Sequence, residues 1–262
     1  MTKEELQLVK QFNIIANKKW IKADDNTIGG IGITFEKELK KKPDSTYFPD
    51  YNGIEIKCTS RFSRYPVTLF SIAFDGPTFP EINRIVKKYG YKDYKYSKKI
   101  FYVNLKCNEK TELIGKNKFS IEISDEEEKM YLCVYNKKDK LVEKKSYIYI
   151  SSIYNHLMVK LQRLAIIKAS KKAENEDTYY RYYKMDLYNL ISFENFIKLL
   201  KEGIININLV SRISRSGPKE GEYRNKNLVF QIDKENLQKM YKLIYSHNVD
   251  LDTNFFSVIE KN

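Results

Sequence analysis

The chain is poor in the residues that build zinc sites and disulfide frameworks. Its 262 residues include three cysteines, Cys58, Cys107 and Cys133, and two histidines. No Cys-x-x-Cys pair occurs, so neither a structural zinc site nor a histidine-dependent nuclease of the HNH type is expected. Because the cysteines are scattered and odd in number, we expect reduced thiols in a cytoplasmic compartment.

Long apolar runs are also missing. No stretch of about eighteen apolar residues exists, so no transmembrane helix is predicted. The first five residues, Met1-Thr2-Lys3-Glu4-Glu5, are partly acidic and lead into no apolar segment of the kind found in signal peptides. We therefore expect neither a membrane span nor a signal peptide.

Acidic residues are outnumbered by basic ones. There are 47 Lys and Arg against 34 Asp and Glu, which gives a net charge of +13 and a pI of about 9.3. Such a balance attracts polyanions. Nucleic acid is the leading candidate partner and an anionic membrane surface is the second, while a basic protein without a polyanionic partner remains the alternative.

The most informative segment runs from Phe48 to Lys57 and reads Phe-Pro-Asp-Tyr-Asn-Gly-Ile-Glu-Ile-Lys. Asn52-Gly53 is a strong signal for a two-residue hairpin turn. In such a turn Tyr51 pairs with Ile54, and Asp50 lies opposite Glu55 with Cβ atoms roughly 4.5–5.5 Å apart. Strand alternation then brings Lys57 to the same face as Glu55 and directs Ile54, Ile56 and Cys58 toward a core.

Two opposed carboxylates destabilise a bare sheet, whereas a divalent cation between them removes the repulsion. Carboxylate oxygens beside an ammonium suit Mg²⁺ and a phosphodiester. The alternative is an ordinary amphipathic hairpin with a surface ion pair. Because Cys58 alternates away from this face, we expect it to be a core residue and not a nucleophile.

Hydrophobic periodicity predicts a mixed α/β fold, either one large domain or two lobes sharing a core. A glycine-rich loop is expected over 24–33, and it lacks the Lys-Ser/Thr of a P-loop. Helices are expected over 1–20, from Thr34 to before Pro43, and over 151–162, 193–201 and 234–247, with a short helix within 76–99. A hairpin is expected over 46–58, and strands are expected over 67–71, 100–105, 130–135, 147–150 and 164–169, with two more within 205–232.

The two strands within 205–232 enclose a basic polar stretch, Val210–Asn227, which carries five basic and two acidic residues, a net of +3. Its basic residues are Arg212, Arg215, Lys219, Arg224 and Lys226. A two-stranded basic ribbon fits the DNA major groove. Tyrosines and lysines also alternate within 76–99, which predicts either a phosphate-backbone contact or a solvated loop edge.

Three spaced motifs resemble the MvaI/BcnI family of type II restriction endonucleases. They are Gly30-Ile31-Gly32-Ile33-Thr34-Phe35-Glu36, Pro49-Asp50 and Ile54-Glu55-Ile56-Lys57. The similarity continues through Thr68-Leu69-Phe70 and residues 161–180 to Phe230 and Ile232, so it covers nearly the whole chain. This family belongs with the mismatch-repair nuclease MutH in the PD-(D/E)xK superfamily.

The resemblance implies a role for each motif residue. Asp50 and Glu55 would hold one or two Mg²⁺ ions, with Mn²⁺ as a substitute. Lys57 would orient or activate the attacking water and stabilise the pentavalent phosphate. Glu36 would support the metal or its waters, and it is otherwise a carboxylate on a helix surface.

The resemblance also implies an architecture and an activity. We expect a restriction-endonuclease-like α/β core of MutH-like architecture, with a catalytic lobe at 1–145 and a DNA-recognition lobe at 146–262 around a DNA cleft. We expect a monomer that cuts double-stranded DNA at a short specific site by nicking each strand in turn. A cognate DNA methyltransferase would protect the host DNA in a bacterial cytoplasm.

The chain departs from the family pattern where the family reads bases. A His-Asp-His stretch and a later arginine are replaced here by Arg224-Asn225-Lys226 and Gln231. Arginine and lysine favour guanine and asparagine favours adenine, so Arg224 and Arg212 predict a site that includes G·C pairs. Two other functions remain open: a MutH-like repair enzyme that nicks one strand, and a DNA-binding protein without catalysis on the same fold.

Overall fold

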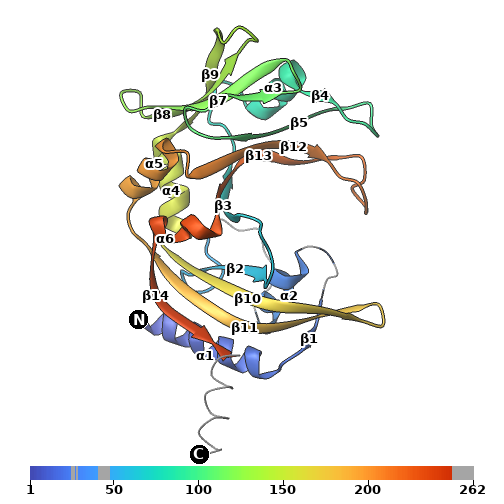
Figure 1. Ribbon diagram of the computed structural model, residues 1–262, viewed down its shortest axis with the longest axis vertical. Helices are drawn as coiled ribbons and strands as arrows, with labels where there is room; N and C mark the ends of the chain where they lie inside the picture. Colours follow the sequence, from blue (N-terminus) through green and yellow to red (C-terminus); the bar gives the residue numbers. More distant parts are fainter. Residues whose placement is uncertain (25–26, 28, 41–47, 250–262) are drawn as a thin grey trace, which may run out of the picture. The chain divides into compact units, whose positions relative to one another are not determined.

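The computed structural model describes residues 1–24, 27, 29–40 and 48–249, except for the side chains of residues 225 and 226 (Figure 1). The chain forms two compact units, each built from segments that are distant in sequence. The first unit comprises Met1–Tyr65, Met158–Ile191 and the chain from Gln238 onward. The second comprises Pro66–Leu157 and Ser192–Leu237. Within the described part, no helix is both long and apolar enough to cross a bilayer.

Five described strands form the sheet of the first unit, in the order β1-β11-β10-β2, with β14 paired to β11. Strand β2 runs parallel to β10, and the other pairs are antiparallel. The parallel pair places Glu55 beside Leu164 and Lys57 beside Ile166. The strands are β1 (Ile21–Lys22), β2 (Glu55–Ser60), β10 (Arg163–Glu174), β11 (Asp177–Leu190) and β14 (Tyr241–Asn248).

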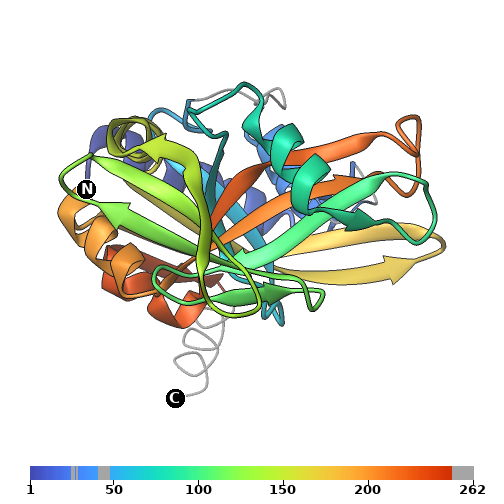
Figure 2. The ribbon, with the colours of Figure 1, turned by 90° about the horizontal axis from the view of Figure 1, so that it is seen from above.

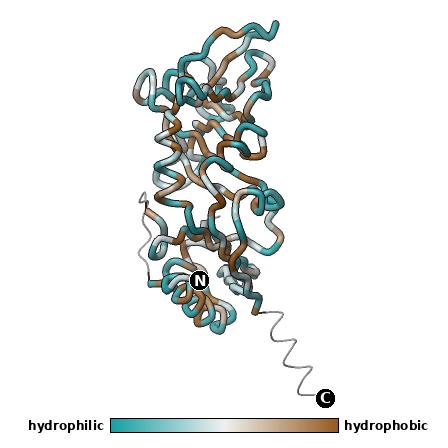
Figure 3. The backbone as a smooth tube through the Cα atoms, turned by 90° about the vertical axis from the view of Figure 1, so that its left-hand side faces the viewer, coloured by the Kyte–Doolittle hydropathy of each residue, from teal (hydrophilic) through white to brown (hydrophobic). Residues whose placement is uncertain are grey.

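Helices α1 (Lys3–Asn17) and α2 (Gly30–Glu38) pack on this sheet through a shared apolar core. A capping box between Thr2 and Glu5 starts α1, because each side chain accepts from the backbone N–H of the other. Apolar and polar residues alternate along its turns (Figure 3). Phe12 and Phe35 are fully buried in the core, and burial of such a side chain contributes about 1.5–3 kcal/mol.

The second unit contains two sheets. Strands β3 (Val67–Ile72), β13 (Tyr223–Ile232), β12 (Ile205–Ile213), β5 (Lys99–Leu105) and β4 (Tyr91–Lys92) form one sheet in that order. Strands β6 (Thr111–Leu113), β7 (Asn117–Ser124), β8 (Lys129–Tyr135) and β9 (Leu141–Tyr149) form the other. The helices of this unit are α3 (Glu81–Tyr89), α5 (Phe193–Lys201) and η1 (Lys234–Asn236). Helices α4 (Ile150–Lys160) and α6 (Leu237–Met240) each contain a boundary between the units.

Aromatic packing and an internal ion network hold the second unit together. The rings of Phe70 and Phe230 stack with centroids 4.5 Å apart. The guanidinium of Arg84 lies 2.5 Å from carboxylate oxygens of both Glu81 and Glu143, whose side chains are almost completely buried. Each charged group of this network has an oppositely charged partner. Because Arg84 lies on α3 and Glu143 lies on β9, the network attaches this helix to this strand.

The α/β fold class is confirmed, and several details of the expected element order are wrong. Helix α2 begins at Gly30, not at Thr34. Glycine disfavours helix in isolation, but packing of Ile31 against the core overrides that preference. The helix expected over 234–247 ends at Met240, and β14 follows as an edge strand on β11. Strands β6, β7 and β11 and the short strands β1 and β4 were not expected, although Phe119, Ile121 and Ile123 alternate with polar residues along β7.

The units also alternate along the chain. The backbone passes between them four times, whereas the sequence analysis places one boundary near residue 145. The cause is the parallel pairing of β2 with β10, since parallel neighbours require a long crossover connection. Here the connection from β2 to β10 contains most of the residues of the second unit. The catalytic and recognition roles of the two lobes remain predictions.

Candidate active site

The Asn52-Gly53 turn has the predicted geometry. Both residues have positive φ, 44° and 81°, as a type I′ turn requires. Tyr51 and Ile54 exchange two backbone hydrogen bonds of 2.9 and 2.8 Å across it. The positive φ favours glycine at position 53, and a Cβ atom added there would lie 2.5 Å from Nη2 of Arg163, so a side chain would displace that guanidinium.

Arg163, the first residue of β10, stabilises this turn through hydrogen bonds. Its Nε donates to the carbonyl of Gly53 and its Nη2 to that of Asn52, each at 3.3 Å. Its Nη1 donates to Oγ1 of Thr2 at 3.2 Å. The hairpin is thereby joined both to the parallel strand and to the start of α1.

The two carboxylates predicted for the site lie at the start of β2. Oδ2 of Asp50 accepts a hydrogen bond from the backbone N–H of Ile56 at 3.0 Å, so its side chain extends the pairing beyond the turn. Ile54 and Ile56 are buried in the core beneath α1 and α2. Glu55 alternates to the other face of the strand, and only 1% of its side chain is exposed.

Two ammonium groups meet one oxygen of Glu55. Nζ of Lys57 lies 2.5 Å from Oε1, and Nζ of Lys160, at the end of α4, lies 3.6 Å from the same atom. Oε2 is buried and has no hydrogen-bond partner among the described residues. Burial raises the pKa of Glu55, Lys57 opposes that rise, and the neighbouring charge of Asp50 adds to it.

Glu36 reaches the same region from α2. Its helix is fixed by Phe35, whose ring lies 4.9 Å from that of Tyr182, and Tyr182 donates a 2.8 Å hydrogen bond to the carbonyl of Ile31. Burial raises the pKa of the Cys58 thiol well above its usual value, and the carboxylates of Glu36 and Asp50 raise it further. Both carboxylates are therefore within electrostatic reach of one sulfur atom.

Cys58 itself packs against the core, as expected, and its raised pKa leaves it a poor nucleophile. Within the described ranges, no group of three or more His, Cys, Asp or Glu side chains is arranged to hold a metal ion. Mg²⁺ does not require one, because it is commonly held by one or two carboxylates together with waters and substrate phosphate. Asp50 and the unpartnered Oε2 of Glu55 fit that requirement.

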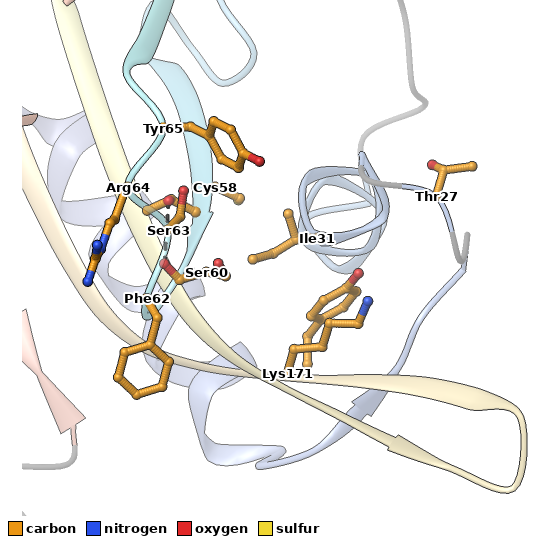
Figure 4. A pocket seen from close by; sticks show the side chains of 11 residues that line it. Thr27, Ile31, Cys58, Ser60, Phe62, Ser63, Arg64, Tyr65 and Lys171 are labelled. Atoms are coloured by element: carbon orange, nitrogen blue, oxygen red, sulfur yellow. Dashed lines mark hydrogen bonds between the residues drawn. The ribbon is translucent and has the colours of Figure 1, made fainter. Parts of the chain in front are cut away.

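A hollow of about 630 Å³ opens beside the end of β2, with Cys58, Ile31 and Tyr65 among its lining residues (Figure 4). The segment that follows the strand alternates basic and aromatic residues and reads Arg61-Phe62-Ser63-Arg64-Tyr65. Phe62 and Tyr65 are 87% and 82% exposed. This segment was not predicted to contribute to the site, although its alternation is visible in the sequence.

The predicted basic ribbon is formed by β12 and β13, in which Arg212 pairs with Arg224. The guanidinium of Arg212 lies 4.0 Å from the ring centroid of Tyr102, and Arg224 is exposed. These three residues line a hollow of about 310 Å³. Lys219 is exposed in the loop that joins the strands. The side chains of the predicted Asn225 and Lys226 lie outside the described residues.

Arg215 is engaged within the protein. Its Nη1 donates to Oδ1 of Asp93 at 2.8 Å, its Nη2 donates to Oδ2, and it stacks 4.4 Å from the ring centroid of Tyr94. These hydrogen bonds lower the pKa of Asp93 to about 2. Through this pairing Arg215 stabilises the loop between β4 and β5.

Further hydrogen bonds connect the loop between β4 and β5 to the ribbon of β12 and β13. Glu220 accepts hydrogen bonds from Nζ of Lys95 at 2.5 Å and from the hydroxyl of Tyr96 at 2.7 Å. Lys98 donates to the carbonyl of Gly221 at 2.7 Å. Both loops extend from one end of their sheet (Figure 2). The tyrosine- and lysine-rich segment and the ribbon therefore form one basic surface.

Comparison with known proteins gives one consistent result. The sequence model of the MvaI/BcnI restriction endonuclease family matches residues 9–241. The solved structure of restriction endonuclease MvaI with its cognate DNA substrate superposes with a TM-score of 0.86 at 27% identity, covering 93% of this chain and 98% of that one. MvaI in the absence of DNA gives a TM-score of 0.58 at 25% identity, with the same coverage. Among curated proteins no match is found.

Proposed function

The chain belongs to the MvaI/BcnI restriction endonuclease family, and on that premise we propose that it is a type II enzyme. It hydrolyses both strands of double-stranded DNA at a short specific sequence and requires Mg²⁺. The observation that carries this proposal is the Glu55 carboxylate, in which two ammonium groups lie near Oε1 and the buried Oε2 has no hydrogen-bond partner among the residues that the structure describes.

Asp50 and Glu55 would hold the metal ion, and Glu36 would support it from α2. A divalent cation bound there lowers the pKa of water and neutralises charge on the phosphate. Mn²⁺, which accepts the same oxygen ligands, substitutes for Mg²⁺. The backbone N–H of Ile56 holds the carboxylate of Asp50, and the parallel pairing with β10 fixes Glu55.

Lys57 acts on the reacting phosphate. Once it leaves Oε1 of Glu55, its ammonium orients the attacking water and stabilises the negative charge that develops on the phosphate oxygens. The water oxygen bonds to phosphorus and gives up one proton to solvent, the bond from phosphorus to the leaving sugar oxygen breaks, and that oxygen takes up a proton from solvent. No covalent intermediate with the protein is needed.

The ribbon of β12 and β13 reads the DNA. Arg224 is exposed beside Arg212 and is suited to a bidentate contact with guanine, so the recognised site includes G·C pairs. Since the described part of the chain carries one Asp-Glu-Lys constellation of this kind, the protein acts as a monomer that nicks one strand and then the other. A cognate methyltransferase protects the DNA of the bacterial host, in whose cytoplasm the enzyme works.

Digestion of unmethylated supercoiled plasmid in Mg²⁺ and in EDTA tests this proposal. Discrete fragments with shared end sequences, formed in Mg²⁺ and absent in EDTA, are the expected result. Nicked circles without linear product would instead support a strand-nicking repair enzyme of the MutH kind. Intact plasmid that is bound in both conditions would support a DNA-binding protein without catalysis.

A further inference from the structure

Lys160 is a second cation at the candidate active site. It comes from the last turn of α4, more than a hundred residues after Lys57, and no motif of the sequence marks it. Its Nζ lies 3.6 Å from Oε1 of Glu55, and its side chain is 24% exposed. Two lysines from different elements thus converge on one carboxylate oxygen.

One lysine on Oε1 would be insufficient if Lys57 is to act on the phosphate. Glu55 is 1% exposed, so even with a metal ion at Oε2 the departure of Lys57 would leave Oε1 a buried acceptor without a donor, which is costly. Lys57, at 2.5 Å, must leave Oε1 in order to reach the reacting group. Lys160 is the charge that remains on Oε1 when it does so.

We propose that Lys160 is a positioning residue for the cleavage step. It holds Oε1 of Glu55 while Lys57 turns to the phosphate, and so keeps Oε2 directed at the metal position. This inference rests on the proposed nuclease function and adds to it a residue outside the Asp-Glu-Lys motif. Lys160 acts through Glu55 and need not touch the DNA.

The surrounding packing separates this role from a purely structural one. Leu161, the next residue, is fully buried, and its carbonyl accepts a 3.1 Å hydrogen bond from the hydroxyl of Tyr241. The end of α4 is therefore anchored by apolar contacts and a backbone hydrogen bond that do not involve the Lys160 charge. Replacement of the ammonium should leave the fold in place.

The chain offers a matched control. Lys184 is 27% exposed and lies 3.2 Å from Oδ1 of Asp186, a buried carboxylate of the same unit. Lys184→Met removes a lysine–carboxylate pair of similar exposure and distance that does not involve Glu55. Any effect shared by the two lysine variants is a general effect of losing such a pair.

The experiment compares wild type, Lys160→Met, Lys160→Gln, Lys160→Arg and Lys184→Met. For each protein we would measure the single-turnover cleavage rate at saturating DNA, DNA affinity in EDTA, Mn²⁺ affinity by calorimetry without DNA, and melting temperature. Lys160→Gln keeps a hydrogen-bond donor without the charge, so it serves if the methionine variant does not fold.

We expect Lys160→Met and Lys160→Gln to cleave roughly 10–100-fold more slowly, as is common when a residue that orients a metal ligand is lost. DNA affinity should stay within about threefold, since the phosphate contacts are unchanged. Mn²⁺ affinity without DNA should stay within about threefold of wild type, because Lys57 still holds Oε1 when no substrate is bound. Lys160→Arg should retain most of the rate, and Lys184→Met should cleave like wild type.

Cleavage by Lys160→Met and Lys160→Gln within about twofold of the Lys184→Met rate would overturn the inference. A loss of DNA affinity as large as the loss of rate would also overturn it, since Lys160 would then bind DNA directly. Failure of the wild type to cleave in Mg²⁺ would refute the nuclease proposal itself, which separates the two outcomes.

Discussion

The ammonium of Lys57 lies 2.5 Å from Oε1 of Glu55, while Oε2 of the same carboxylate is buried without a hydrogen-bond partner among the described residues. A buried polar atom without a partner is costly, and such atoms are rare in folded proteins. The one-sided pairing is explained if Oε2 binds a cation and the lysine is released during the reaction. The following predictions test parts of this explanation.

Replacement of Lys57 by methionine should stop cleavage and leave DNA binding largely intact. The ammonium is needed only when charge develops on the phosphate, and loss of one such group costs roughly 10²–10³ in rate. Cleavage and electrophoretic binding assays on the same protein preparation measure both effects. Cleavage at the wild-type rate would remove Lys57 from the catalytic set.

Glu36→Gln should slow cleavage chiefly at low Mg²⁺. If Glu36 supports the metal ion or its waters, the amide lowers apparent metal affinity roughly 10–100-fold, and higher Mg²⁺ restores part of the rate. Cleavage rates across a Mg²⁺ titration measure this shift. Glu38→Gln on the same helix, where Glu38 pairs with Lys18 at 2.5 Å, serves as the control. If the cleavage rates of wild type, Glu36→Gln and Glu38→Gln depend on Mg²⁺ identically, Glu36 has no role at the metal site and is only a surface carboxylate.

Arg224→Ala should weaken discrimination between the cognate site and a site with one G·C pair changed, by roughly 1–3 kcal/mol. Arg224 is exposed on β13, whereas Arg215 is occupied by Asp93. Arg215→Ala should therefore loosen the β4–β5 loop without changing the preferred base. Binding measured on a panel of single-substitution duplexes separates the two effects, and an unchanged preference in Arg224→Ala would refute its role in base reading.

The second unit should lose stability in acid through Glu143. Although burial favours its neutral form, hydrogen bonds from Arg84, Lys88 and Tyr89 lower the pKa of Glu143 from 4.5 to about 2. Because the folded-state pKa is the lower one, the stabilisation is complete above pH 4.5 and is lost as the pH falls toward 2.

The advantage of wild type over Glu143→Gln, roughly 2 kcal/mol near neutral pH, should shrink across that window. Unfolding by urea at a series of pH values measures it. A difference that does not change between pH 5 and pH 2 would contradict the assignment.

The sequence was sufficient for the hairpin of the candidate active site because its signals are local. Asn52-Gly53 defines a turn, the alternation from Ile54 to Lys57 assigns two faces, and both are confirmed. It was insufficient for β14, where tertiary pairing with β11 decided the conformation of residues with mixed propensity. The place of Glu36 at the site came only from the family resemblance, since no local rule relates a helix residue to a later hairpin.

Contacts between distant segments were also beyond the sequence. Lys160 reaches Glu55 because β2 and β10 are parallel neighbours and α4 ends just before β10. Similarly, Arg215 and Arg224 carry the same charge, and only the fold shows that Arg215 is paired with Asp93. The charge pattern of the sequence therefore predicts the basic ribbon, but it does not show which of the arginines is exposed.

The central claim is that Glu55 binds the metal ion required for cleavage, and the most direct test is one measurement on Glu55→Gln. Glutamine keeps the shape of the side chain and removes its charge, so DNA affinity in EDTA should match that of wild type. We predict that Glu55→Gln binds cognate duplex yet yields no product in Mg²⁺ under single-turnover conditions. Cleavage at a rate within about tenfold of wild type would contradict the account, because loss of a metal ligand should cost far more.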